Sequence, residues 1–258
     1  MTAAALSLRV YEFWFLQYRR VWRGTVITSV INPVFYLSAL GVGLGTLVNR
    51  SGSQPLGVSY LDFVAPGLLA ATAMQIASGE STWPVVASFK WTRQYFAMLA
   101  TPLGVRNIIA GHQLWMATRI ASTAAVYLAV IAAFGGINSY LGILTLPVAV
   151  LLGLAFTTPT AAYAATVESD SAFVPYNRFV IVPMFLFSGT FFPVSRLPLP
   201  LEWLAYTTPL WHGVDLCREL TLGNVHLLRA LGHVGYLLLF VIAGLVWGER
   251  TYKQRLFN

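Results

Sequence analysis

Glu80 and Arg119 are the first candidates for chemistry in this sequence, because each lies within a long run of mostly apolar, uncharged residues. A charged side chain is costly to bury in apolar surroundings. It therefore pairs with an opposite charge, lines a polar path, or reaches out to water. We expect Glu80 and Arg119 to pair with each other, and the two other arrangements are the alternatives.

A second set of polar residues lies nearer the C-terminal end. His212, Asp215 and Glu219 are spaced by three and four residues, which places them on one face of a helix, where they could bind a metal ion. An ordinary polar helix face is the alternative. His226 and His233 are seven residues apart and allow the same two interpretations. We expect no metal site at either place, because metal sites need better-defined ligand sets.

Several chemical classes are excluded by what the sequence lacks. It contains no G-x-x-x-x-G-K-[ST] loop, no H-E-x-x-H and no G-x-S-x-G. The one cysteine, Cys217, forms no internal disulfide and is expected to be a small apolar filler. We therefore expect a protein that is not itself an enzyme and binds no cofactor. Any ATP and Mg²⁺ would be bound by a partner.

The composition identifies the surroundings of these residues as a lipid bilayer. Hydrophobic residues make up 57% of the chain and charged residues 10%, and 48 uncharged residues lie between Arg119 and Glu168. About 20 apolar residues cross a membrane as a helix. The sequence predicts an all-α membrane protein, with one domain over 1–258 and six transmembrane helices at 25–48, 60–87, 108–134, 140–167, 179–190 and 227–247.

The positive charges indicate the orientation of this domain. With both termini on one side, that side carries 11 of the 16 basic residues. Because positive loops stay in the cytoplasm, we expect both termini in the cytoplasm of a bacterial cell, with the chain in its inner membrane. The net charge of +7 is accounted for by this distribution, so we expect no nucleic acid as a partner.

Three segments outside the spans have their own patterns. Residues 5–23 predict an amphipathic helix in the cytoplasmic interface, with an extension of the first span as the alternative. Residues 88–107 are basic and aromatic and predict a short helix parallel to the membrane. Residues 191–226 are rich in proline, with scattered charges, and predict two short re-entrant helices on the external side, since irregular backbone at membrane depth must be covered.

Two stretches carry a family resemblance. Residues 185–220 read FLFSGTFFPVSRLPLPLEWLAYTTPLWHGVDLCREL, in which S-G-x-x-F-P is followed by L-P, by P-L and by an arginine. This resembles the hallmark segment of ABC-2 type transporter permeases, and within them the nodulation-factor (NodJ-type) and drug or glycolipid exporters. The chain also resembles this group at Glu80, Tyr95, Met98-Leu99, Thr101-Pro102-Leu103, Gly111, Leu114-Trp115 and Arg119.

The resemblance implies a permease subunit of an ATP-driven exporter. Such a subunit pairs with a second permease copy or a similar permease, and two ABC ATPase subunits dock on it. The cargo would be an amphipathic glycolipid, lipid-linked oligosaccharide or hydrophobic drug. By similarity, 88–107 is the coupling loop, with contacts from Arg93, Tyr95, Met98, Leu99, Thr101 and Pro102. The external segment is marked by Gly189, Pro193, Pro198, Trp203, Pro209 and Arg218.

Two other functions stay open at this point. One is a membrane-embedded, lipid-modifying enzyme that uses His212, Asp215 and Glu219. The other is a channel or proton-coupled transporter that works without ATP and uses Glu80 and Arg119. Co-purification of an ATPase would contradict the first, and transport that continues without ATP would favour the second.

Overall fold

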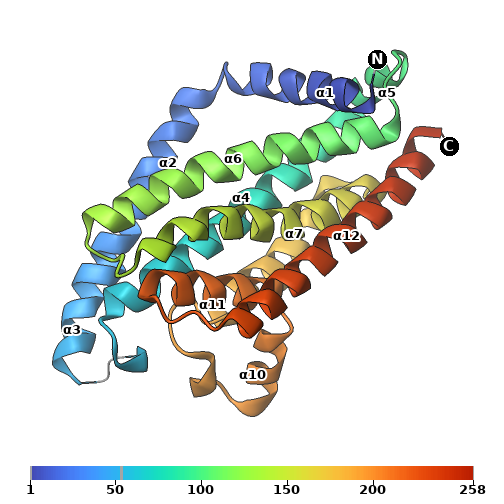
Figure 1. Ribbon diagram of the computed structural model, residues 1–258. Coiled ribbons are helices and arrows are strands. Elements are labelled where there is room, and N and C mark those ends of the chain that lie inside the picture. Colours follow the sequence, from blue (N-terminus) through green and yellow to red (C-terminus); the bar gives the residue numbers. More distant parts are fainter. Residues whose placement is uncertain (1, 53–54, 258) are drawn as a thin grey trace.

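Long helices dominate the part of the chain that the computed structural model describes, residues 2–52 and 55–257, and no strand occurs in that part. They lie obliquely side by side in one bundle (Figure 1). Five helices within the described residues are long and apolar enough to cross a membrane: Trp22–Arg50, Tyr60–Lys90, Val105–Ala133, Tyr140–Thr166 and Leu227–Phe257.

Helix α4 (Tyr60–Lys90) is the centre of the bundle. In its most apolar window 72% of the residues are buried, against 19% in the first of these helices and 17% in the last. It packs against α6 (Val105–Ala133) and α7 (Thr145–Thr166). The outer helices therefore expose apolar side chains, which suits a surface that faces lipid tails.

Helices α7 and α12 (Leu227–Phe257) pack along each other at very short range. Gly244 of α12 lies directly against α7, where an added Cβ atom would be 2.4 Å from Thr158 Oγ1 and 2.6 Å from the backbone nitrogen of Pro159. Only glycine allows two backbones to approach so closely. This contact fixes α12 on the bundle at about its middle.

Local sequence signals explain where the helices begin and bend. The Ser59 side chain accepts a hydrogen bond from the backbone nitrogen of Asp62 and caps α4. Pro33 lies inside α2 (Trp22–Tyr36) and removes one backbone donor. The same span continues as the π-helix Leu37–Leu44 and then as α3 (Gly45–Arg50).

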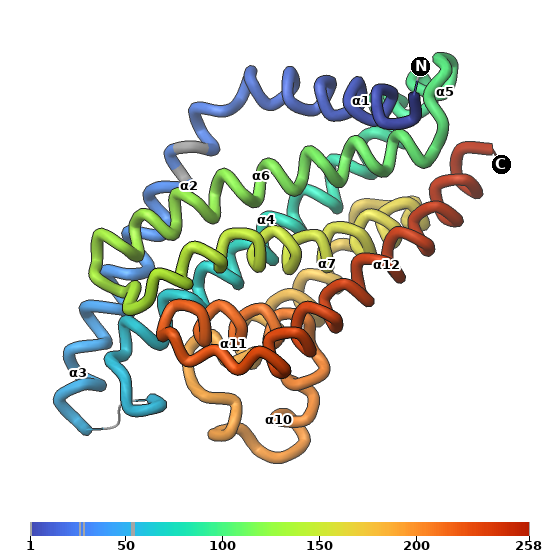
Figure 2. The backbone as a smooth tube through the Cα atoms, in the orientation of Figure 1, coloured from blue at the N-terminus to red at the C-terminus, as the bar shows by residue number. Residues whose placement is uncertain are grey.

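Helix α1 (Ala3–Tyr18) lies across one end of the bundle, and the chain turns sharply between it and α2 (Figure 2). It packs on α6 at Gly111, where an added Cβ atom would be 2.5 Å from the Ser7 carbonyl oxygen. Both described chain ends and α5 (Gln94–Leu99) lie at this end. Helix α10 (Leu199–Tyr206) lies at the other end (Figure 1).

The predicted span at 179–190 is not among the five long apolar helices. Its residues belong to a run of short helical pieces over 170–187, which starts earlier and ends earlier than expected. The run consists of Asp170–Ala172, α8 (Phe173–Tyr176), the π-helix Asn177–Ile181 and α9 (Val182–Phe187). Two prolines lie in it, and Asn177 and Arg178 lower its hydropathy, so the sixth span stays a prediction.

The other helices extend beyond the predicted spans at some ends. α12 is the largest case, because it continues to Phe257, beyond the predicted end of the last span at 247. Charged residues such as Glu249 and Lys253 are good helix formers, and they lie four apart and form an ion pair. The periodic apolar pattern ends before the helix does.

Candidate functional site

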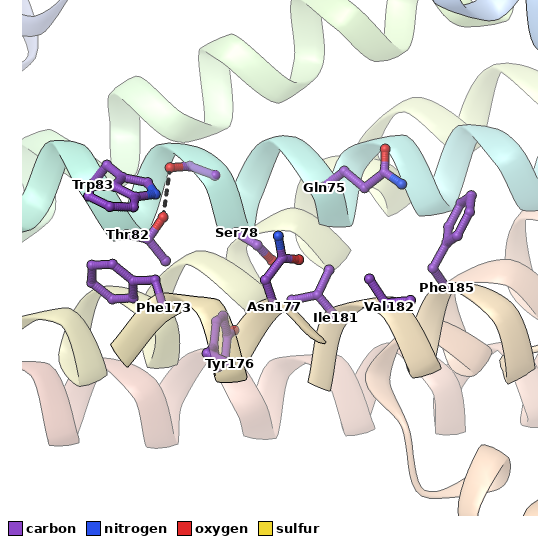
Figure 3. Close-up of a pocket in the computed structure, with 11 residues that line it drawn as sticks. Gln75, Ser78, Thr82, Trp83, Phe173, Tyr176, Asn177, Ile181, Val182 and Phe185 are labelled. Atoms are coloured by element: carbon purple, nitrogen blue, oxygen red, sulfur yellow. Dashed lines mark hydrogen bonds between the residues drawn. The ribbon is translucent and has the colours of Figure 1, made fainter. Parts of the chain in front are cut away.

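A groove lies between α4 and the helical run 170–187, as Figure 3 shows. Its volume is ≈ 370 Å³. Amide and hydroxyl groups alternate along it with aromatic rings, and none of its lining residues is charged. The polar side chains that line it are Gln75, Ser78, Thr82 and Asn177, and the aromatic ones are Trp83, Phe173, Tyr176 and Phe185.

The ring contacts give this groove a defined shape. Trp83 of α4 meets Phe173 of α8 edge to face, with ring centroids 5.6 Å apart. The Thr82 hydroxyl donates to the Gly79 carbonyl oxygen at 3.0 Å (Figure 3). Sequence reasoning missed this groove, although residues 75, 78 and 82 have helical spacing on one face of α4. That spacing is the signal that could have revealed it.

The expected pair of Glu80 and Arg119 is present, although its geometry is loose. Arg119 Nε lies 4.0 Å from Glu80 Oε1, and the side chains are 6% and 39% exposed. Arg119 Nη1 also donates to Thr123 Oγ1 at 2.8 Å, and its guanidinium lies 5.1 Å from the Tyr18 ring centroid. Arg119 thus contacts α4, α6 and the end of α1. A stacked ring adds a favourable contact to a buried cation.

The coupling loop contains the short helix α5, but Tyr95 points inward. Its side chain is 0% exposed and packs edge to face on Phe89, while Tyr252 of α12 lies 5.7 Å away between ring centroids. Burial raises the pKa of Tyr95 to about 12, so the phenol stays neutral. We expected Tyr95 to touch an ATPase. The structure leaves no surface of this residue for a partner and makes it the anchor of the loop.

The other expected contacts of this loop divide into outer and inner residues. Arg93 is exposed and adopts a left-handed backbone conformation with φ 49° just before α5. Thr101 and Pro102 are also exposed. Met98 and Leu99 are half-buried against the core. Phe96, with 40% of its surface exposed, joins the outer set.

Residues 188–226, called the cap below, are fastened to α4 by Arg218 of α11 (Pro209–Leu222). Its Nε donates to the Phe63 carbonyl oxygen at 3.2 Å and its Nη2 to the Gly189 carbonyl oxygen at 2.8 Å. The guanidinium lies 3.9 Å from the Phe63 ring centroid. Burial lowers the pKa of Arg218 to about 10, so it is still charged at neutral pH.

Two glycines make this attachment possible. Gly189 has φ +80°, a left-handed conformation that turns the chain out of α9. Opposite it, a Cβ atom on Gly67 of α4 would lie 3.0 Å from the Thr190 carbonyl oxygen. Gly189 of the hallmark S-G-x-x-F-P therefore contacts Arg218 directly, although 29 residues separate them in the sequence.

The other marked residues of the cap are helix starters, with one exception. Pro193 and Pro198 are N-caps of a short 3₁₀-helix and of α10, and Pro209 begins α11, where a proline costs no hydrogen bond. Trp203 of α10 is 69% exposed. The rest of the chain therefore leaves most of this ring uncovered. Within the cap, α11 is the buried helix and α10 is largely exposed.

The polar residues of α11 do not gather into one site. His212 Nδ1 lies 2.7 Å from Nδ1 of His233 on α12, and His233 Nε2 lies 3.4 Å from Asp215 Oδ2. Glu219 instead pairs with Arg229 at 3.2 Å. No group of three or more metal-binding side chains occurs among the described residues. The contact between the two histidines could not be read from their sequence spacing.

Cys217 lies on the buried side of α11 as a free thiol with 0% exposure. Burial raises the pKa of this thiol to about 12, which leaves little of the nucleophilic thiolate at neutral pH. The residue therefore acts as apolar filling.

Comparison with known proteins agrees with these features. The chain is 32% identical to the nodulation protein J of Rhizobium leguminosarum bv. viciae over 252 residues, which cover 97% of this chain and 95% of that protein. It is 31% identical to the nodulation protein J of Rhizobium meliloti over 250 residues, 96% and 93% of the two chains. It is 24% identical to the inner membrane transport permease YadH of Escherichia coli over 233 residues, 88% and 86% of the two.

A family model supports the same grouping and covers most of the chain. The model of the ABC-2 type transporter matches residues 10–222, which include α4, the coupling loop and Arg218. The bundle of long apolar helices is what a membrane permease of this kind requires. The chain belongs to the ABC-2 type transporter family.

Proposed function

We propose that this chain is the membrane subunit of an ATP-driven exporter that moves an amphipathic substrate out of the cytoplasm or the inner leaflet. The groove between α4 and 170–187 carries the proposal. It combines amide and hydroxyl groups with aromatic rings and lies between helices of the bundle. A cargo with a polar head and an apolar chain needs both kinds of surface.

The chemistry of the groove narrows the cargo class. Amides and hydroxyls donate and accept hydrogen bonds without attracting either sign of charge, and aromatic rings stack on flat apolar faces. This mixture fits the sugar part of a glycolipid or a lipid-linked oligosaccharide better than a purely hydrophobic drug.

In this proposal a partner subunit hydrolyses the ATP, because the sequence has no P-loop. Two ABC ATPase subunits, which bind ATP and Mg²⁺, would dock at the coupling loop beside the exposed Arg93 and Phe96. A second permease copy would complete the path. The loop and both described chain ends lie at one end of the bundle, which supports termini in the cytoplasm of a bacterial inner membrane, with the cap outside (Figure 1).

The test uses a tagged chain purified from its native membrane and placed in lipid nanodiscs. We expect an ABC ATPase to co-purify, and a short-chain glycolipid probe to stimulate its ATP hydrolysis. The double variant Thr82→Val/Asn177→Leu should keep the ATPase but lose at least about tenfold in this stimulation, because the groove loses two of its four polar side chains.

Two charge reversals serve as matched variants. Arg93→Glu should lose the ATPase, whereas Arg196→Glu, an exposed arginine in the cap, should keep it. If no ATPase co-purifies with the unaltered chain, or if vesicles move the probe without ATP, the exporter proposal is wrong. A probe that is chemically altered by the purified chain would instead favour a lipid-modifying enzyme.

A further inference from the structure

A histidine pair joins the cap to the last helix of the bundle. His212 of α11 and His233 of α12 face each other through their Nδ1 atoms at 2.7 Å. His233 is 4% exposed, and its Nε2 faces Asp215 Oδ2 at 3.4 Å. His233 of α12 therefore contacts both Asp215 and His212 of α11.

Aromatic rings enclose this histidine pair. Tyr236 of α12 stacks on His212 with ring centroids 3.9 Å apart, and Trp211 meets His233 at 5.3 Å. The Tyr236 hydroxyl donates to the Thr207 carbonyl oxygen, which adds a second contact between the cap and α12. The rings of Tyr236 and Trp211 thus pack on the two imidazoles.

The charged and titratable groups that face the pair come from three helices. Asp215, Arg218 and Glu219 lie on α11, Arg229 lies on α12, and Tyr206 lies on α10 with its hydroxyl bonded to Glu202. Burial raises the pKa of Asp215, but the hydrogen bond from His233 and the nearby Arg218 and Arg229 outweigh it and leave this pKa below its ordinary value. Asp215 thus stays ionised in mild acid and its single charge faces His233.

A contact between two Nδ1 atoms contains one proton. One nitrogen donates it and the other accepts it, so at least one ring must present a lone pair. When both rings carry protons on these nitrogens, two donors and two positive charges face each other at hydrogen-bonding distance. That arrangement is repulsive, and the rings must separate.

We propose that acid on the cap side of the membrane separates α11 from the outer end of α12 by protonating His212 against the facing His233, and so loosens the cap. The statement that this side is external rests on the proposed function. The proton is the only ligand that the step requires, and it comes from the medium.

The environment of His212 determines whether acid stabilises or destabilises the closed contact. Burial and the facing His233 lower the pKa of His212 to about 4, so the closed contact favours the neutral ring. When the contact opens, the ring returns to its ordinary pKa of 6.5. The closed state is therefore unaffected above that value, and it loses stability as the pH falls from about 6.5 toward about 4.

The cap carries its own probe for this opening. Cys217 is the only cysteine in the sequence, and it is fully buried on α11. We would measure its labelling by N-ethylmaleimide in the purified full-length protein in nanodiscs, at about pH 7.5 and about pH 5. Each rate is divided by the rate for the denatured protein at the same pH, which removes the effect of pH on the thiol itself.

The normalised labelling rate should rise about 30-fold on going to about pH 5, as the change in the pKa of His212 requires. His212→Gln should abolish the rise, since glutamine cannot be protonated. His233→Gln should only reduce it, because burial is the larger cause of the lowered pKa of His212 and the facing His233 is the smaller one. His226→Gln is the matched control, because His226 is exposed near the same end and should keep the full response.

Two results would overturn the inference. One is a normalised rate in the unaltered chain that changes less than twofold between the two pH values. The other is a rise that persists in His212→Gln, which would assign it to a carboxylate. The assay needs neither ATP nor cargo, so failure of the exporter proposal would appear in the hydrolysis measurements and leave these labelling rates unchanged.

Discussion

The cap and the coupling loop are both fastened to the bundle, but by different physical means. The cap is held by a buried cation, Arg218, which donates one hydrogen bond to the Phe63 carbonyl oxygen of α4 and one to the Gly189 carbonyl oxygen within the cap. The coupling loop is held by the rings of Phe89, Tyr95 and Tyr252, which meet at centroid distances between 4.9 and 5.7 Å. One attachment is directional and charged, and the other is apolar.

This difference has mechanical consequences. Hydrogen bonds to a fixed carbonyl weaken steeply when the angle changes, so the cap has one preferred position. Ring contacts lose little energy when the rings slide or tilt. The apolar attachment therefore lets the coupling loop tilt while it remains bound, which suits a segment pushed by a partner. The directional attachment holds the cap in one position until its hydrogen bonds break.

The largest effect is expected at the cap. Arg218→Met removes both hydrogen bonds and should lower the free energy of unfolding by about 4 kcal/mol, because bonds from a charged donor contribute about 1.5 to 3 kcal/mol each. Arg196→Met, the exposed control in the same segment, should change it by less than about 0.5 kcal/mol. Thermal unfolding in detergent measures both. Equal stability of the two variants would mean that Arg218 does not fasten the cap.

The coupling loop should respond to the loss of a ring. Tyr95→Ala leaves a cavity beside Phe89 and Tyr252 and should cost about 3 kcal/mol, whereas Tyr95→Phe keeps the ring and should cost less than about 1 kcal/mol. Limited proteolysis after Arg93 would report the loosened loop. If Tyr95→Phe were as damaging as Tyr95→Ala, the attachment would depend on the hydroxyl group, and the contrast with the cap would disappear.

The smallest effect is expected at Glu80 and Arg119. Their separation of 4.0 Å and the 39% exposure of Glu80 indicate a coupling of about 1 kcal/mol. A double-mutant cycle of Glu80→Leu, Arg119→Leu and the combined variant measures it through thermal unfolding. The combined variant should be less damaged than the sum of the single ones. Strict additivity would show that Thr123 and Tyr18, and not Glu80, are what hold Arg119.

Much of the bundle could be predicted from the distribution of charges. The uncharged runs give five long helices close to the expected places, because lipid permits few other structures in such runs. The span near Phe179 stays a prediction. The segment changes helix type at Asn177, and its contacts with both α4 and α7, which place it in the bundle, could not be read from the sequence.

The candidate sites were less predictable, because they depend on which helix faces meet. The pairing of Glu80 with Arg119 could be predicted, since a charge in an apolar run needs a partner. The inward direction of Tyr95 and the contact of His212 with His233 could not. A tyrosine in a basic loop looks exposed, and two histidines 21 residues apart have no fixed relation until α11 folds back on α12.

Gly244 bears on how the molecule moves. Its contact with Thr158 and Pro159 is too close to allow α12 to rotate or slide on α7 without a clash. These two helices must therefore travel together as a rigid body. The run 170–187, whose helix type changes twice, is better suited to bending than this α7–α12 pair.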